Sequence, residues 1–212
     1  MNAPDPNPVF ERYPTLAVCR DDLMRALQIC SEAFSHGKRM LVCGNGGSAA
    51  DAEHIVGELM KGFLKSRPVP EAFRSALKAE DEAGGAEIAD RLQGALPALS
   101  LCGHPALSTA FANDVAPEML FAQQVYGYGG RGDVLLAIST SGNSRNVVNA
   151  VIVARALGMR TVGLTGRAGG RLAELCDATV RVPADHTPDI QELHLPVYHW
   201  LCRALEEVFF PT

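Results

Sequence analysis

The stretch MLVCGNGGSAADAEHIVGE, residues 40–58, constrains the fold of this chain more than any other. Its first four residues are apolar and have the length of a buried strand. The glycines that follow tolerate positive φ and let the backbone approach a ligand closely. Ser48 is placed to cap a helix that is expected to run to about Leu64 and whose first residues are rich in alanine. Because a helix N-terminus attracts anions, this order of strand, glycine loop and helix predicts an α/β fold with a phosphate site.

Length and composition limit the class of protein. The chain has 212 residues, 47% hydrophobic and 20% charged, which is typical of one globular domain. Its net charge of −5 gives no overall attraction to nucleic acid or to an anionic membrane. No apolar run is long enough to cross a membrane, and the first residues lack the apolar core of a signal peptide. We therefore expect a cytoplasmic protein with no nucleic-acid or membrane partner. Its six cysteines are scattered along the sequence, and we expect them to be free thiols.

Apolar runs that alternate with helical spacing predict a parallel sheet covered on both faces, in a single domain over residues 1–212. A first helix is expected over about 15–36 and a last one over 190–209. In such folds ligands lie at the carboxyl ends of the strands, so the loops 44–48 and 139–144 are expected to face one pocket. The strands are expected at 40–43, 98–102, 134–138, 161–164 and 178–182.

Residues 65–97 interrupt this alternation. They are rich in charge, contain three prolines, and predict two short amphipathic helices, at about 71–80 and 86–93, laid over the domain. A solvated insertion and a lid or oligomer contact both remain open.

The second polar loop, STSGNS at 139–144, offers hydroxyls and the amides of the following helix to an anion. Serine, glycine and asparagine are also ordinary turn residues. The presence of a second loop of this kind after another strand favours phosphate binding.

Four candidate polar residues lie on two helices. His54 and Glu58 are four residues apart and share one helix face, where they could act as a general base with its partner or as two metal ligands. Gln191 and His199 lie about 12 Å apart along the last helix. If both serve one site, we expect a neighbouring chain to supply one of them. A surface or interface position is the alternative for His199 and for the nearby His194.

Several separated motifs together resemble the sugar isomerase (SIS) domain of phosphoheptose isomerases: GNGGSAADAEH with Glu58, Asn113-Asp114, ISTSGNSRN, and IQELH with His199. The resemblance covers nearly the whole chain apart from about 65–97. It implies a three-layer sandwich with a five-stranded parallel, flavodoxin-like sheet, usually in a homotetramer with sites between subunits. The implied reaction converts D-sedoheptulose 7-phosphate to D-glycero-D-manno-heptose 7-phosphate, the first step of activated heptose biosynthesis.

The resemblance also implies roles for individual residues. Glu58 and His199 would be the proton-transfer pair, and one zinc ion per subunit would be bound by His54, Glu58, Gln191 and His199. No nucleotide cofactor is expected, since the glycine loop lacks the G-x-G-x-x-G spacing of a dinucleotide site. Contacts with the phosphorylated seven-carbon sugar would come from Asn45, Gly46, Gly47, Ser48, Asn113, Asp114, Ser139, Thr140, Ser141, Ser144 and Gln191.

A non-catalytic protein is the alternative. One SIS paralogue is a tetrameric protein that binds the bacterial replication initiator, and it has a similar glycine loop and ISTxGNSR segment. It lacks the catalytic carboxylate and the final histidine, which are present here as Glu58 and His199, and this favours the enzyme. A sugar-phosphate-sensing SIS module usually accompanies a DNA-binding domain, and no such domain fits this sequence.

Overall fold

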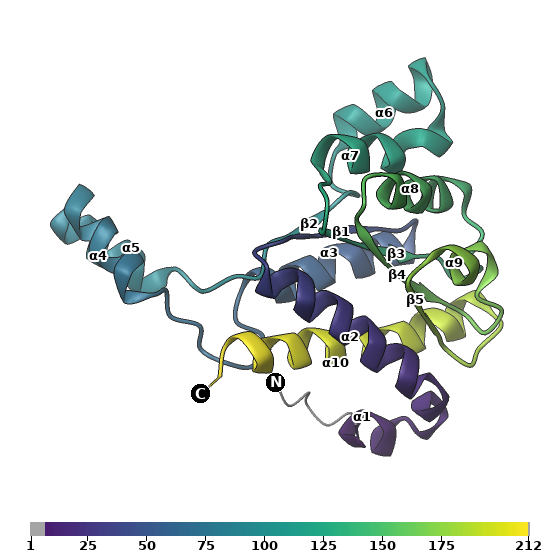
Figure 1. Cartoon of the computed structure of the whole chain (residues 1–212), viewed down its shortest axis with the longest axis horizontal. Coiled ribbons are helices and arrows are strands. Elements are labelled where there is room, and N and C mark those ends of the chain that lie inside the picture. Colours follow the sequence, from purple (N-terminus) through teal and green to yellow (C-terminus); the bar gives the residue numbers. More distant parts are fainter. Residues whose placement is uncertain (1–6, 212) are drawn as a thin grey trace.

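A computed structural model describes residues 7–211 of the chain. They form a five-stranded parallel sheet with the order β2-β1-β3-β4-β5, and helices cover both of its faces (Figure 1). The predicted α/β sandwich is thereby confirmed, and each predicted strand is confirmed to within two residues at either end. The strands are β1 (Met40–Cys43), β2 (Ala98–Ser100), β3 (Val134–Ile138), β4 (Arg160–Thr165) and β5 (Ala178–Arg181).

The helices follow the predicted order. The sequence predicts a single domain over residues 1–212. Residues 1–6 and 212 of that range lie outside the residues that the structure describes. The helical elements are α1 (Asn7–Arg12), η1 (Pro14–Cys19), α2 (Arg20–Ser35), α3 (Gly47–Met60), α4 (Glu71–Glu80), α5 (Glu82–Arg91), α6 (Pro105–Asp114), η2 (Pro117–Met119), α7 (Leu120–Tyr128), α8 (Arg145–Ala156), α9 (Gly170–Leu175) and α10 (Thr187–Phe209).

Two cores hold the layers together, because alternate side chains of each strand point to opposite faces of the sheet. Met40 and Val42 of β1 pack with α2, α3 and α10 in one core. Leu41 and Cys43 pack with α7, α8 and α9 in the other. All six cysteines are free thiols, as expected. Among the helices of residues 7–211, none combines the length and apolar character needed to cross a membrane.

Several helix boundaries differ from the prediction, and α10 begins at Thr187 rather than at residue 190. The expected helix over 15–36 is divided, because Pro14 begins a 3-10 turn and α2 starts only at Arg20. Ser48 does not cap α3. The helix begins one residue earlier, at Gly47, and its cap is Gly46, which has a φ of +56°. The same helix stops at Met60 rather than near residue 64, because Lys61 has extended backbone angles.

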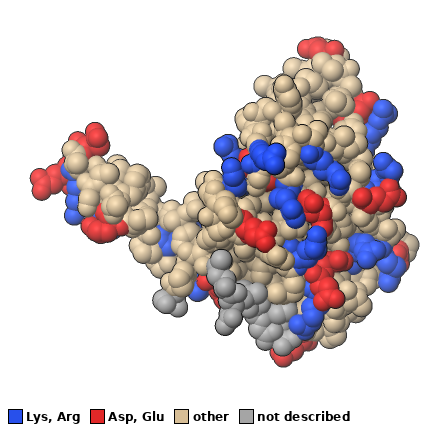
Figure 2. Space-filling view, viewed as in Figure 1, with Lys and Arg blue, Asp and Glu red and all other residues tan. Residues whose placement is uncertain are grey.

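The insertion between Arg67 and Gln93 forms a helical hairpin of α4 and α5 that projects away from the body (Figure 1). The prediction that these helices lie over the domain is therefore wrong. No residue of α4 is buried, and the two helices pack against each other, with an ion pair of 2.6 Å between Arg74 and Asp90. Asp81 caps α5 by accepting a hydrogen bond from the Gly84 amide, which is why α5 begins earlier than predicted. The hairpin carries acidic and basic side chains (Figure 2).

His194 of α10 lies in the core. It has 0% exposure and so does not occupy the surface or interface position considered from the sequence. Burial lowers its pKa to about 4, against a smaller opposing effect of the Thr165 backbone. In the unfolded chain a histidine has a pKa near 6.5. Between pH 4 and pH 6.5, His194 therefore binds a proton more readily in the unfolded chain than in the folded one. The stability contributed by neutral His194 is therefore complete above about pH 6.5 and is lost as the pH falls towards 4.

We predict that His194→Leu weakens the acid sensitivity of folding. Between pH 7 and pH 4 the wild type should lose about 3 kcal/mol of unfolding free energy through this group, and the variant should not. Urea unfolding at fixed protein concentration at several pH values measures the difference between the two proteins. His36→Gln, at an exposed histidine, is the control and should follow the wild type. A wild-type-minus-variant difference that is constant with pH would contradict the prediction.

Candidate functional site

The two polar loops predicted from the sequence lie next to each other at the carboxyl ends of β1 and β3, which are neighbouring strands. Their contact is made by two asparagines. Asn45 donates its side-chain amide to Asn146 at 2.9 Å, and Asn146 donates back to Asn45 at 2.8 Å. Asn146 is the second residue of α8 and was not among the predicted site residues. Its position within the segment ISTSGNSRN was the available signal.

The loop 139–144 gathers hydroxyl groups at the N-terminus of α8. Ser139 is buried, and its Oγ lies 2.9 Å from the Oγ of Ser144. Ser144 occupies the cap position of α8 without a side-chain capping bond. Gly142 has a φ of +67° and closes the turn by donating its amide to the Ser139 carbonyl at 2.9 Å. Hydroxyls and a helix N-terminus in one place suit an anion such as phosphate, and Thr140 and Ser141 belong to the same turn.

Gln191 reaches the first of these loops from α10. Its side chain lies so close to Gly47 that a Cβ at that glycine would meet the Gln191 Nε2. With a larger residue there, the Gln191 side chain would have to shift. The structure brings Gln191 to the loop 44–48, which also contains Gly46 and the buried Ser48.

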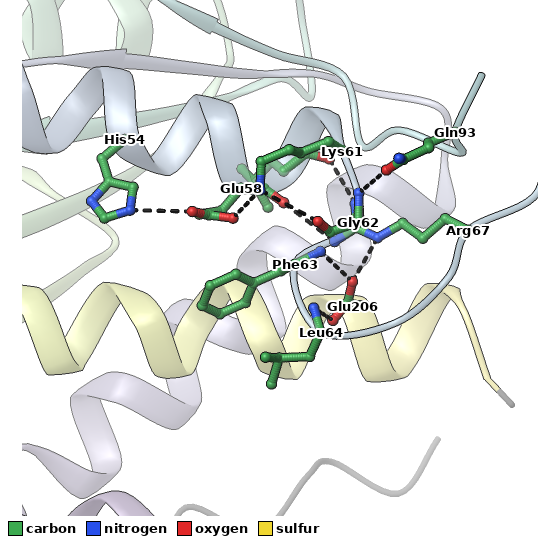
Figure 3. A network of polar contacts seen from close by, with 10 residues as sticks. His54, Glu58, Lys61, Gly62, Phe63, Leu64, Arg67, Gln93 and Glu206 are labelled. Atoms are coloured by element: carbon green, nitrogen blue, oxygen red, sulfur yellow. Dashed lines mark hydrogen bonds and ion pairs between the residues drawn. The ribbon is translucent and has the colours of Figure 1, made fainter. Parts of the chain in front are cut away.

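The second group of residues lies along α3 and α10. The Nε2 of His54 is 3.2 Å from the Oε1 of Glu58, and the ring of His54 meets the ring of His199 edge-on at 5.1 Å between centroids. Lys61 places its Nζ 2.8 Å from the Oε2 of Glu58 (Figure 3). Lys61 was not among the site residues predicted from the sequence.

A tyrosine fixes the orientation of His54. Tyr198 donates its hydroxyl hydrogen to Asp51 at 3.2 Å, and burial followed by the Asp51 charge raises the pKa of Tyr198. The tyrosine oxygen lies 3.0 Å from the Nδ1 of His54, so this nitrogen donates. The Nε2 of His54 then faces the carboxylate of Glu58. This arrangement requires a proton or a cation between the two side chains.

His199 is the other imidazole of this group. Its Nε2 is buried and has no hydrogen-bond partner within the described structure. Burial, and then the neighbouring His54, lower the pKa of His199, while Glu58 opposes the shift. His199 lies on a groove of about 670 Å³ that is also lined by Phe63 and Trp200. The protonated form of His199 is therefore disfavoured, and its Nε2 is unpartnered.

The predicted metal ligands are only partly assembled. His54, Glu58 and His199 are neighbours, but Gln191 lies with Gly47 instead. As the side chains stand in residues 7–211, no three His, Cys, Asp or Glu side chains converge on a metal position. Two features nevertheless fit a zinc ion: the donor types, and the unpartnered nitrogen of His199, whose ring contacts that of His54.

Asn113 and Asp114 stand apart from both groups. They end α6, a helix that buries no residue, and both side chains are exposed. Asn113 donates its side-chain amide to Asp114 at 2.8 Å. The structure of one chain thus does not bring these two residues to the loops, and their role in substrate binding stays a prediction.

Comparisons with known proteins agree with this geometry. A family model described as SIS domain matches residues 15–98 and 75–166. A phosphoheptose isomerase of a Nitratiruptor species is 42% identical over 181 residues, covering 85% of this chain and 83% of that protein. The phosphoheptose isomerase of Akkermansia muciniphila is 35% identical over 202 residues, covering 95% and 93%. Among solved structures, a phosphoheptose isomerase from Neisseria gonorrhoeae is 30% identical, with a TM-score of 0.74 over 92% of this chain and 91% of its own.

We predict that Gly142→Ala disrupts the second loop. A Cβ at Gly142 would lie against the Gly169 carbonyl oxygen, and its φ of +67° is strained for alanine. The free energy of unfolding should fall by about 3 kcal/mol or more. Urea unfolding measures the loss. Gly127→Ala, at an exposed helical glycine with no atom within 4 Å of the added Cβ, is the matched control and should change stability by about 1 kcal/mol or less. Equal effects at both glycines would contradict the steric argument.

Proposed function

The chain belongs to the phosphoheptose isomerase family of SIS-domain proteins, and on this premise we propose that it converts D-sedoheptulose 7-phosphate to D-glycero-D-manno-heptose 7-phosphate through an enediol. It is a sugar-phosphate isomerase, and its product enters activated heptose biosynthesis. The observation that carries the assignment of roles is the contact of His54 with both Glu58 and His199, which lie on two different helices.

The substrate phosphate is bound at the N-terminus of α8. The hydroxyls of Ser139, Thr140, Ser141 and Ser144 and the helix amides supply its hydrogen bonds without a cationic side chain. The sugar hydroxyls are bound by the loop 44–48, which is supported by the Asn45–Asn146 pair and by Gln191. Holding the phosphate at one end fixes where C1 and C2 lie relative to α3 and α10.

Proton transfer needs one base near the carbons and one donor near the oxygens. The carboxylate of Glu58 removes a proton from C1 of the open-chain ketose and returns it to C2. The neutral ring of His199 gives a proton to O2 and takes one from O1, which leaves the aldose and restores both side chains. The ammonium of Lys61, 2.8 Å from Glu58, stabilises the carboxylate charge between turnovers.

Zinc is the cofactor that the donor set fits, at one ion per subunit, held by His54, Glu58, His199 and Gln191. When bound, it would polarise the substrate carbonyl. Within one chain the Gln191 side chain lies against Gly47, so Gln191 would have to leave that contact to complete the ligand set of a neighbouring subunit.

We propose further that the protein is a cytoplasmic homotetramer with sites between subunits. The position of Asn113 and Asp114 supports this arrangement, because these residues are exposed at the end of a helix that buries nothing within its own chain. A neighbouring subunit would bring such a pair to a site that one chain leaves incomplete.

We predict that Glu58→Gln and His199→Ala each lower kcat by about 100-fold or more, because each removes a group that transfers a proton. Purified protein is incubated with sedoheptulose 7-phosphate, with and without added zinc, and aldoheptose phosphate formation is followed. Glu32→Gln and His36→Gln, at exposed positions on and beside α2, are the matched controls and should retain wild-type turnover. An inactive wild type under both conditions would overturn the enzymatic assignment and favour a protein-binding role.

A further inference from the structure

A buried ion pair lies where the end of α3, which carries Glu58, meets α10, which carries His199. Arg67 and Glu206 both have side chains with 0% exposure, and the Arg67 Nε lies 2.8 Å from the Glu206 Oε1 (Figure 3). Neither residue belongs to the proposed catalytic pair, and neither was singled out by the sequence. A fully buried ion pair is weak evidence for a stabilising role, because the cost of removing two charges from water can exceed their attraction. Its contacts indicate another role.

Arg67 holds the end of α3. Its guanidinium donates to the backbone carbonyl of Leu59 at 2.9 Å and to that of Glu58 at 3.2 Å. These carbonyls lie in the last turn of the helix, where they have no partner within the helix itself. Arg67 thus binds the backbone of the proposed base directly, and the positive charge also complements the helix C-terminus.

Glu206 holds the segment that follows α3. Its Oε1 accepts a hydrogen bond from the Phe63 amide and its Oε2 one from the Leu64 amide, each at 2.8 Å. Burial would raise the pKa of Glu206, but these amides and Arg67 together keep this pKa below its ordinary value. Glu206 is therefore a carboxylate whose two oxygens fix the path of the chain away from Glu58.

The same contacts reach His199. The ring of Phe63 packs against the ring of His199 at 5.5 Å between centroids. Glu206 also lies seven residues beyond His199 on α10, and therefore on the same face of that helix. A single ion pair thus connects the Glu58 backbone on one helix with the packing of His199 on the other.

We propose that Arg67 and Glu206 are positioning residues that set the separation and orientation of Glu58 and His199. This inference rests on the proposed function for the roles of those two residues. A displacement of about 1 Å between reacting groups lowers a rate by about 100-fold without a comparable change in substrate binding. The pair acts on the proton-transfer step, and the phosphate loop at the far end of the substrate is unaffected by it.

The test replaces both charges together, by Arg67→Met with Glu206→Leu, so that no unpaired charge is left in the core. We expect a folded protein with a lower melting temperature, because the Phe63 and Leu64 amides lose their acceptor and the Glu58 and Leu59 carbonyls lose a donor. Its kcat should be lower by about 10-fold to 100-fold, with KM changed by no more than about threefold. A wild-type kcat in a folded double variant would overturn the proposal, because it would show that the ion pair is not needed to position Glu58 and His199.

A second variant keeps the test decisive if the double variant does not fold. Arg67→Lys retains the positive charge opposite Glu206 but lacks the planar fork that reaches two carbonyls. It should fold and show the same selective loss of kcat. Unchanged kcat in folded Arg67→Lys would count against positioning through the Glu58 backbone.

The matched control is Arg74→Met with Asp90→Leu, which removes an arginine–carboxylate pair from the projecting hairpin. It should leave kcat and KM unchanged.

A second readout separates this proposal from the assignment of the substrate: the NMR chemical shift of the His199 ring proton on Cε1. In the Arg67–Glu206 double variant this shift should move, and in the control it should not, whether or not the wild type turns over sedoheptulose 7-phosphate. An inactive wild type with a shifted His199 signal would refute the function and keep the positioning role, whereas an unmoved signal would refute the positioning role.

Discussion

The pairing of β1 with β3 is the constraint on which the site depends. The chain passes from β1 outward to β2 on one side and then returns to continue with β3, β4 and β5 on the other. At this reversal the connections that leave neighbouring strand ends diverge to opposite faces of the sheet, which opens a crevice. The loop after β1 enters α3, which packs in the core with α2 and α10. The loop after β3 enters α8, which packs in the other core. Asn45 and Asn146 join the two loops across the point of divergence.

The parts of this arrangement that could be predicted from sequence are those fixed by local patterns. The central strands β1 and β3 are fully buried apolar runs, so they were recognisable, and the polar loops after Cys43 and Ile138 followed directly. Strand order is different, because it is set by packing between elements far apart in the chain. The Asn45–Asn146 pair spans 101 residues and depends on β1 lying beside β3. Neither asparagine alone indicates a partner, and for this reason Asn146 was missed.

The buried ion pair could not be predicted for a similar reason. Charged side chains are almost always exposed, so Arg67 within a charged insertion and Glu206 on an amphipathic helix both indicate surface positions. Their separation of 139 residues hides the contact. The early end of α3 has the same origin: Lys61 leaves the helix, and the amides of the next two non-glycine residues, Phe63 and Leu64, bond to Glu206. Helix propensity depends on residues that are close in the sequence, so it cannot predict that the distant Glu206 carboxylate binds these amides.

The projecting hairpin and the ion pair meet at one place. Residues on the two sides of the hairpin form an antiparallel bridge between Pro68 and Gln93, and Gly94 donates its amide to the Arg67 carbonyl at 2.6 Å. Gln93 in turn accepts from the Gly62 amide at 2.6 Å. The chain therefore leaves and re-enters the body at neighbouring points that are fixed by hydrogen bonds. Lengthening a loop between fixed ends costs little conformational entropy, so helices can be added there while the body keeps its shape.

The same junction explains how the fold tolerates an insertion next to its proposed base. Gln93 and Gly94 bind the backbone of Gly62 and Arg67, and Arg67 binds the backbone of Glu58. The hairpin is held by the network that also holds α3, so its own packing need not contribute to the position of Glu58. An insertion that relied on its helices to close the site would need a face packed on the body, and α4 has no buried residue. The buried junction is thus the part of the structure that fixes Glu58, and the surface residues of the hairpin can differ without changing that position.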